Sequence, residues 1–108
     1  MGEREPKSKQ FEDIYYGLSS SPGILKLATS GLGWKTADSE NIVTISAEDF
    51  KKIQWMRVAR DYQLKIALKN GSAARFDGFV KDNFETLREF IRTNYKLNLE
   101  TKVHQLIE

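Results

Sequence analysis

The residues that could carry chemistry in this chain are few. It has one histidine, His104, and no cysteine, which excludes a thiolate nucleophile, a disulfide and a cysteine-ligated zinc site. The carboxylate pairs Glu12/Asp13 and Glu48/Asp49 are adjacent in the sequence, and adjacent residues of a strand point to opposite faces. No serine stands in a GxSxG pattern. The sequence therefore argues against an enzyme and predicts neither a cofactor nor a metal site.

A second candidate for chemistry is the glycine pair of "GLGW", Gly31 and Gly33, followed by Trp34. A dinucleotide-binding loop needs a third glycine and a following helix, but Thr36 stands at the third position and no helical pattern follows. We expect both glycines to shape a tight connection between strands, with Trp34 as a buried anchor. The alternative is that Trp34 contacts a partner.

A third candidate is the segment 51–65, in which basic residues alternate with Trp55 and Tyr62. Its basic residues are Lys51, Lys52, Arg57, Arg60 and Lys65. Such a segment could be a structural strand, a protein-contact surface or a grip on nucleic acid. The whole chain has 17 basic and 15 acidic residues, a net charge of +2, which is too balanced to indicate nucleic-acid binding by itself.

The elements that must position these residues are mostly short strands in a chain of 108 residues, the size of one domain. Alternating or β-branched patterns predict seven strands, in 11–18, 24–29, 30–36, 42–46, 51–59, 62–69 and 72–79. Asn70 and Gly71 predict a hairpin with a type I′ turn between the last two. Residues 1–10 are polar, lack the apolar stretch of a signal peptide, and are expected to be a flexible tail.

The period changes after the last strand. Apolar residues in 81–96 recur at helical spacing, and Asp82 with Glu85 resembles a capping box. Residues 99–107 also keep helical spacing of apolar side chains. Strands followed by a helix predict a mainly β domain, an antiparallel sheet or barrel with a C-terminal helix packed on one end or face.

Several of these pieces occur together in a recognisable order. They are "FEDIYYGLSSSPGILKLATSGLGWK", "QWMRVARDYQLKI", "NG", "RFDGF" and "DNFETLREFIRTNY". Over residues 11–98 the chain resembles the N-terminal domain of the small subunit of FACT, a eukaryotic histone chaperone. The resemblance implies a pleckstrin-homology-like fold, a bent antiparallel sandwich of about seven strands with a C-terminal helix, over 11–108.

The family resemblance also implies a function. The domain would be a dimerisation module that pairs with the large FACT subunit, in a nuclear complex that reorganises nucleosomes in transcription and replication. Histones and nucleosomal DNA would be contacted by the whole complex. No membrane and no small-molecule substrate is implied.

Residue types favour particular roles within that function. Aromatic, methionine and arginine side chains dominate protein interfaces. The predicted partner-binding residues are Met56, Arg57, Arg60, Tyr62, Arg75 and Asp77. The predicted structural anchors are Gly31, Gly33, Trp34, Trp55, Phe76, Gly78 and Phe79.

The alternative is a pleckstrin-homology-like domain that binds DNA or phosphoinositide through the basic and aromatic residues of 51–65. Lipid headgroups need several cations that converge on one site. The loop predicted between the first two strands, "GLSSSPG", has no lysine or arginine, which argues against lipid binding.

Overall fold

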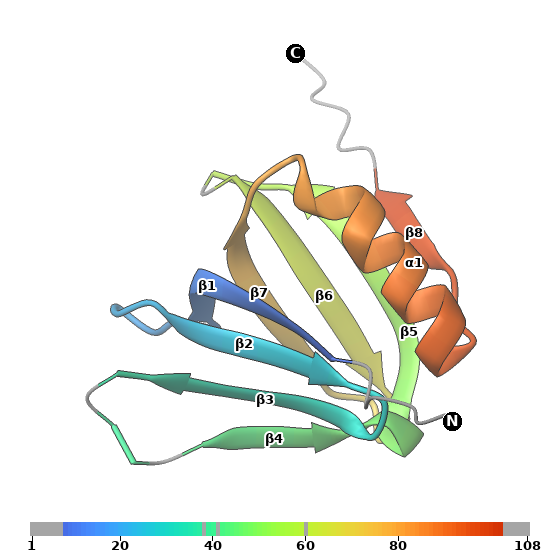
Figure 1. Ribbon diagram of the computed structural model, residues 1–108, viewed down its shortest axis with the longest axis horizontal. Helices are drawn as coiled ribbons and strands as arrows, with labels where there is room; N and C mark the ends of the chain where they lie inside the picture. Colours follow the sequence, from blue (N-terminus) through green and yellow to red (C-terminus); the bar gives the residue numbers. More distant parts are fainter. Residues whose placement is uncertain (1–7, 38, 41, 60, 103–108) are drawn as a thin grey trace, which may run out of the picture.

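The computed structural model describes residues 8–37, 39–40, 42–59 and 61–102. Within these residues, eight strands and one α-helix follow one another (Figure 1). They are β1 (Ser8–Tyr16), β2 (Gly23–Ala28), β3 (Gly31–Thr36), β4 (Val43–Ser46), β5 (Phe50–Arg57), β6 (Tyr62–Leu68), β7 (Ala73–Phe79), α1 (Asn83–Tyr95) and β8 (Leu99–Lys102), with a short 3-10 helix at Ala47–Asp49. The predicted fold class, a mainly β bent sandwich with a C-terminal helix, is confirmed.

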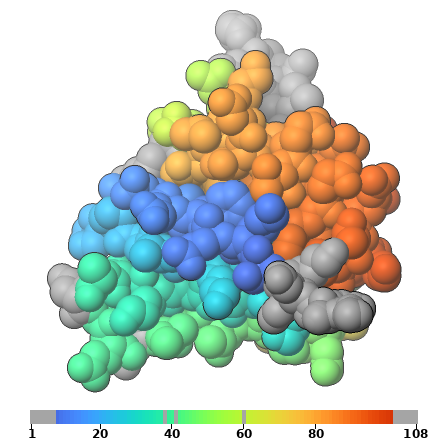
Figure 2. Space-filling model, viewed as in Figure 1, coloured from blue at the N-terminus to red at the C-terminus, as the bar shows by residue number. Residues whose placement is uncertain are grey.

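The strands form one continuous sheet in the order β4-β3-β2-β1-β7-β6-β5-β8. Neighbouring strands are antiparallel except β5 and β8, which are parallel. Figure 1 shows the β2–β4 half set at an angle to the β5–β7 half, with α1 and β8 beside β5. In the surface view, β1 lies between the β2–β4 half and the segment that leads into α1 (Figure 2). The core lies between them and is closed by Leu87, Phe90 and Ile91 of α1.

The sheet bends into a sandwich at β1. The first part of β1 pairs with β2, and its last two residues, Tyr15 and Tyr16, pair with β7. Asp13 has a positive φ of 59°, where the ladder to β2 is interrupted. Opposite it, Gly78 has a φ of 107°, and a Cβ there would come within 2.6 Å of the Asp13 carbonyl oxygen. The bend therefore depends on the glycine at position 78.

Trp34 packs at the same corner and is 8% exposed. Its indole N–H donates a hydrogen bond to the Ile14 carbonyl at 2.9 Å, and its ring lies 5.4 Å from that of Tyr16. A Cβ on Gly23 would approach an indole carbon to 2.8 Å, so the small residue leaves room for the ring. Trp34 is an anchor on the core side of β3.

The two glycines before Trp34 differ in position within β3 and in the space around them. Gly31 begins β3 with a φ of 150°, and a Cβ there would collide with the Ile45 carbonyl oxygen. Gly33 lies inside β3, where a Cβ would meet nothing closer than 3.8 Å. The expectation that Gly33 shapes the connection between strands is wrong, because the turn precedes both glycines and Gly33 is paired on both sides, with Lys26 and Thr44.

The predicted hairpin joins β6 and β7, but its turn type differs. The Gly71 N–H bonds to the Leu68 carbonyl at 3.0 Å, and the Leu68 N–H bonds to the Ser72 carbonyl at 2.8 Å. Gly71 has a positive φ of 97° whereas Asn70 does not, so this is a three-residue loop with a glycine bulge rather than a type I′ turn. The Asn70 side-chain oxygen instead accepts from the Ser72 N–H at 2.9 Å.

Helix α1 begins without the predicted capping box. Asp82 makes no side-chain capping hydrogen bond, and Glu85 instead pairs with Arg88 at 2.9 Å. The Asn83 side-chain oxygen accepts from the Val80 N–H at 3.0 Å. The polar residue that organises this helix start is therefore one position later than predicted.

Both ends of the chain also differ from expectation. β1 begins at Ser8, so residues 8–10 of the expected tail belong to the sheet. At the other end Leu99 starts a strand rather than a helix, because β8 pairs with β5 and buries Leu99 beside Ile53. Residues 1–7 and 103–108, including His104, lie outside the described residues.

Tyr95 ties the end of α1 to the turn between β2 and β3. Its hydroxyl donates to the Ala28 carbonyl at 2.6 Å, and its ring lies 4.9 Å from that of Phe50, edge to face. Burial raises the pKa of Tyr95 to about 12 because it disfavours the charged phenolate. The helix is thereby anchored to the opposite half of the sandwich.

We expect Trp34→Ala to lower the free energy of unfolding by about 3 to 5 kcal/mol, because it opens a cavity and removes the bond to Ile14. Trp34→Phe keeps most of the volume and loses the indole N–H, so it should cost clearly less. Urea unfolding of the three proteins measures both effects. An unchanged unfolding midpoint in Trp34→Ala would contradict the anchoring role.

A second prediction concerns the Tyr95 hydroxyl. Tyr95→Phe should cost about 1 kcal/mol near neutral pH through the lost hydrogen bond to Ala28. The pKa of Tyr95 is raised from 10.0 to about 12 in the folded protein. The free energy of unfolding of the wild type therefore falls as pH rises through that interval, whereas Tyr95→Phe has no hydroxyl to ionise and shows no such fall. The difference between the two free energies of unfolding should therefore shrink at about pH 11. A difference independent of pH would show that Tyr95 does not resist ionisation.

Candidate functional site

The predicted partner-binding residues do not form one cluster. Met56, Arg75 and Asp77 lie on the outer face of β5–β7, as their cross-strand pairing through β6 requires. Arg57 and Tyr62 lie on the core side, at the end of β5 and the start of β6. Arg60 lies outside the described residues.

The outer face of β5–β7 carries mixed charges around a methionine. Gln63 and Asp77 are cross-strand partners, and the Gln63 amide donates to the Asp77 carboxylate at 2.7 Å. Met56 is half-buried next to Gln63, and exposed Arg75 is the cross-strand partner of Lys65. A surface with both signs of charge and a flexible apolar side chain suits contact with a folded protein.

The second group is an aromatic corner formed by Trp55, Tyr62 and Phe84. The Trp55 and Tyr62 rings stack at 5.0 Å with an angle of 12°, and Phe84 lies 5.5 Å from Trp55. The Arg57 guanidinium lies 5.9 Å from the centre of the Tyr62 ring, a cation–π contact. Beside the rings is a hollow of about 450 Å³, which Lys81, Asp82, Glu85 and Thr101 also line. Trp55 is buried in the core, Tyr62 and Phe84 are half-buried and Arg57 is exposed, so this corner is where the core meets the surface.

The remaining predicted anchors lie in the interior. Phe76 and Phe79 are fully buried, and Trp55 is 5% exposed. Gly78 has the positive φ and the close approach to β1 described above. By packing in the core, these residues fix β5 and β7, and so they also position Met56, Arg75 and Asp77 on the outer face of the same strands.

The described basic residues of 51–65 divide between two places. Lys52 and Lys65 share the outer face of β5–β7, Arg57 lies at the aromatic corner, and Lys51 is exposed near the start of β5. In the part of the chain that the structure describes, no group of three or more His, Cys, Asp or Glu residues could hold a metal ion. No helix within the same residues is long and apolar enough to cross a bilayer.

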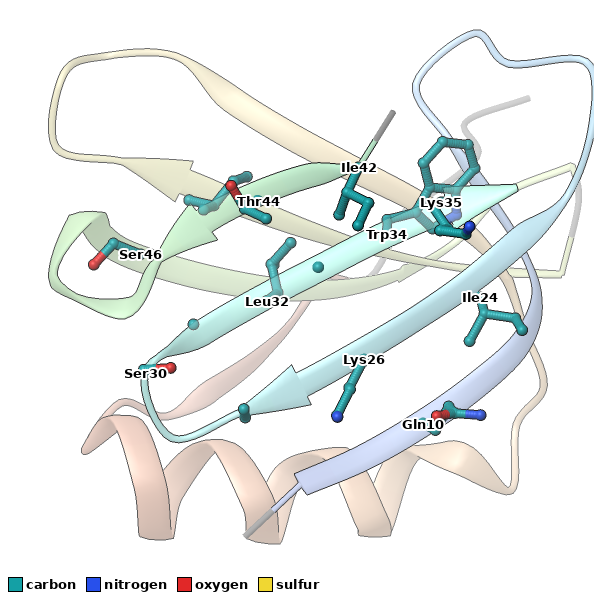
Figure 3. Close-up of a pocket in the computed structure, with 14 residues that line it drawn as sticks. Gln10, Ile24, Lys26, Ser30, Leu32, Trp34, Lys35, Ile42, Thr44 and Ser46 are labelled. Carbon is teal, nitrogen blue, oxygen red and sulfur yellow. The ribbon is translucent and has the colours of Figure 1, made fainter. Parts of the chain in front are cut away.

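Sequence reasoning missed a groove on the outer face of β2–β4, with a volume of about 640 Å³ (Figure 3). Its walls include Ile24 and Lys26 from β2 and Thr44 from β4, and Gly33 lies between them. The sequence does contain a signal for this face, since Ile24 and Lys26 alternate with Leu25 and Leu27 and must therefore point away from the core. The sequence does not show that Lys26 and Thr44 flank Gly33, because this depends on the register of the strands.

Comparison with known proteins agrees with this architecture. Residues 9–101 match the family described as POB3-like N-terminal PH domain. A FACT complex subunit POB3 from Mycosarcoma maydis is 41% identical over 86% of this chain and 19% of the relative. A FACT complex subunit pob3 from Schizosaccharomyces pombe is 36% identical over 89% of this chain and 19% of the relative. The chain thus spans about a fifth of the length of these relatives.

Among solved structures, one described as "Structure of the Spt16D Pob3N heterodimer" is similar with a TM-score of 0.88. That match has 33% sequence identity and covers 93% of this chain and 57% of the other. The match over nearly all of the described strands and the helix agrees with the resemblance carried by the sequence motifs. The chain belongs to the family of POB3-like N-terminal PH domains.

Proposed function

We propose that this domain is a docking module, which joins the small subunit of a FACT-type histone chaperone to its large subunit. The observation that carries the proposal is its similarity to a chain solved as part of the Spt16D–Pob3N heterodimer. In this proposal histones and nucleosomal DNA are handled by the assembled complex in the nucleus.

We place the contact on the outer face of β5–β7. A stable protein interface buries about 800 Å² on each partner, with a few anchor residues near its centre. Met56 and Arg75 are available there, and the hydrogen bond from Gln63 holds the Asp77 carboxylate in a fixed position. Exposed Arg57 and half-buried Tyr62 contact each other on the other side of these strands, so we do not place them at the centre of the contact.

The first test is binding to the dimerisation domain of the large FACT subunit, measured by calorimetry. Wild type should bind, and Met56→Glu combined with Arg75→Glu should weaken binding by at least about tenfold, or 1.4 kcal/mol. A matched control combines Leu18→Glu, in the exposed β1–β2 loop, with Arg92→Glu on α1, and should bind as wild type does. A single Arg60→Glu variant tests the predicted residue outside the described part.

The outcomes separate the function from the surface. A folded Met56 and Arg75 double variant that binds as tightly as wild type would place the contact elsewhere on the sandwich. Failure of the wild type to bind the large-subunit domain at all would refute the docking function itself.

A further prediction concerns the alternative, anionic ligands at 51–65. With a net charge of only +2, DNA binding by this domain should be weak, independent of sequence, and lost between about 50 and 200 mM salt. Phosphoinositide vesicles should not bind saturably. Electrophoretic mobility shift and vesicle sedimentation measure these effects, and sequence-selective DNA binding at physiological salt would favour the alternative.

A further inference from the structure

A groove runs along β3 on the outer face of the β2–β4 half (Figure 3). Gly31 and Gly33 are alternate residues of β3 and lack side chains on this face. One wall is formed by Ile24 and Lys26 of β2, and the other by Ile42 and Thr44 at β4. We call this feature the β3 groove. At about 640 Å³ it has the size of a ligand site.

The fold does not require the glycine at the centre of this groove. Gly33 has no positive φ, and a Cβ there would meet nothing closer than 3.8 Å, so larger residues could stand at this position. Glycine inside a strand weakens it, and often marks a place where another backbone or a ligand comes close. Gly31, in contrast, is required, since its Cβ would collide with Ile45. The open centre of the groove is therefore a property of the surface rather than of the core.

The dimensions of the groove select an extended ligand. Its walls stand on the two neighbours of β3, two strand spacings or roughly 10 Å apart between backbones. An α-helix with its side chains is about 10–12 Å wide and cannot sink between such walls. An extended chain can lie over β3 with alternate side chains pointing to Gly31 and Gly33, because both repeats have the same spacing of about 6.6 Å.

The side chains around the groove select its chemistry. Among the described residues that line it, Lys26 and Lys35 are charged and no carboxylate is present. Ile24 and Ile42, which are 41% and 57% exposed, are two of the few large apolar side chains on the described surface. An acidic segment with apolar residues complements both features. Single-stranded nucleic acid fits less well, since it needs exposed aromatic rings for stacking and Trp34 is 8% exposed.

We propose that the β3 groove binds an extended acidic segment of a partner protein, with two alternate aliphatic side chains seated over Gly31 and Gly33. Carboxylates on either side of these aliphatic residues pair with Lys26 and Lys35. This site is independent of the docking function proposed above, because it lies on the other half of the sandwich.

The test uses a fluorescein-labelled peptide, acetyl-Glu-Glu-Leu-Asp-Leu-Glu-Glu-amide, and fluorescence anisotropy with the 108-residue chain. One control peptide replaces both leucines by serine, and another replaces the acidic residues by glutamine and asparagine. A labelled oligothymidine of similar charge tests nucleic acid. We expect saturable binding of the first peptide, and binding at least about tenfold weaker for each control ligand.

Two protein variants test the two features separately. Gly33→Leu fills the groove and should weaken peptide binding at least about tenfold, with a melting temperature equal to or above that of wild type. Lys26→Glu combined with Lys35→Glu should weaken it as much through charge. The matched control, Lys52→Glu combined with Lys69→Glu, makes the same change of charge outside the groove and should bind as wild type does.

The result that overturns the proposal is absence of saturable peptide binding, unchanged binding by both groove variants, or tighter binding of oligothymidine than of the peptide. If Gly33→Leu does not fold, the lysine variants and the serine peptide still decide the matter. Titration of Gly33→Leu with the large-subunit domain separates the two proposals, because that affinity should remain unchanged.

Discussion

The hydrogen bond from the Trp34 indole to the Ile14 carbonyl stands where the whole sheet changes direction. β1 leaves β2 and joins β7 within a few residues of this bond, so the two halves of the sandwich share one strand. The corner tolerates a buried polar N–H because the carbonyl accepts it. It tolerates the close approach of β7 to β1 because Gly78 has no side chain. The angle between the two halves of the sandwich is therefore set at this corner.

The bend also determines how many surfaces the domain can offer. A flat sheet would turn both halves toward the same partner, whereas the bent sheet turns the outer faces of β2–β4 and β5–β7 in different directions (Figure 1). The two proposed sites can therefore be occupied together without direct competition. Tyr95 and β8 then close the opposite side of the core, where α1 meets Ala28 and Leu99 meets Ile53.

Most of the fold could be predicted because alternation and helical spacing are local signals, and they located all seven strands before the helix. The feature missed at the end of the chain depends on a distant contact, because Leu99 begins a strand only where β5 offers it an edge. The feature missed at the helix start is a local competition, in which Glu85 pairs with Arg88 one turn later instead of capping the helix. Trp55 and Arg57 are alternate residues of β5 and so share a face, but the contact of both with Tyr62 depends on the register between β5 and β6, which the sequence does not show.

Gly31 and Gly33 show why the candidate site was harder to predict than the fold. In the sequence they are equivalent glycines before a tryptophan, and one interpretation was given to both. In the structure the Ile45 carbonyl excludes a side chain from Gly31, while nothing nearby excludes one from Gly33. A glycine that the backbone requires and a glycine that leaves a surface open cannot be told apart without the neighbouring strand. The fold does not need the small size of Gly33, so the reason for a glycine at this position has to lie on the outer surface rather than in the core.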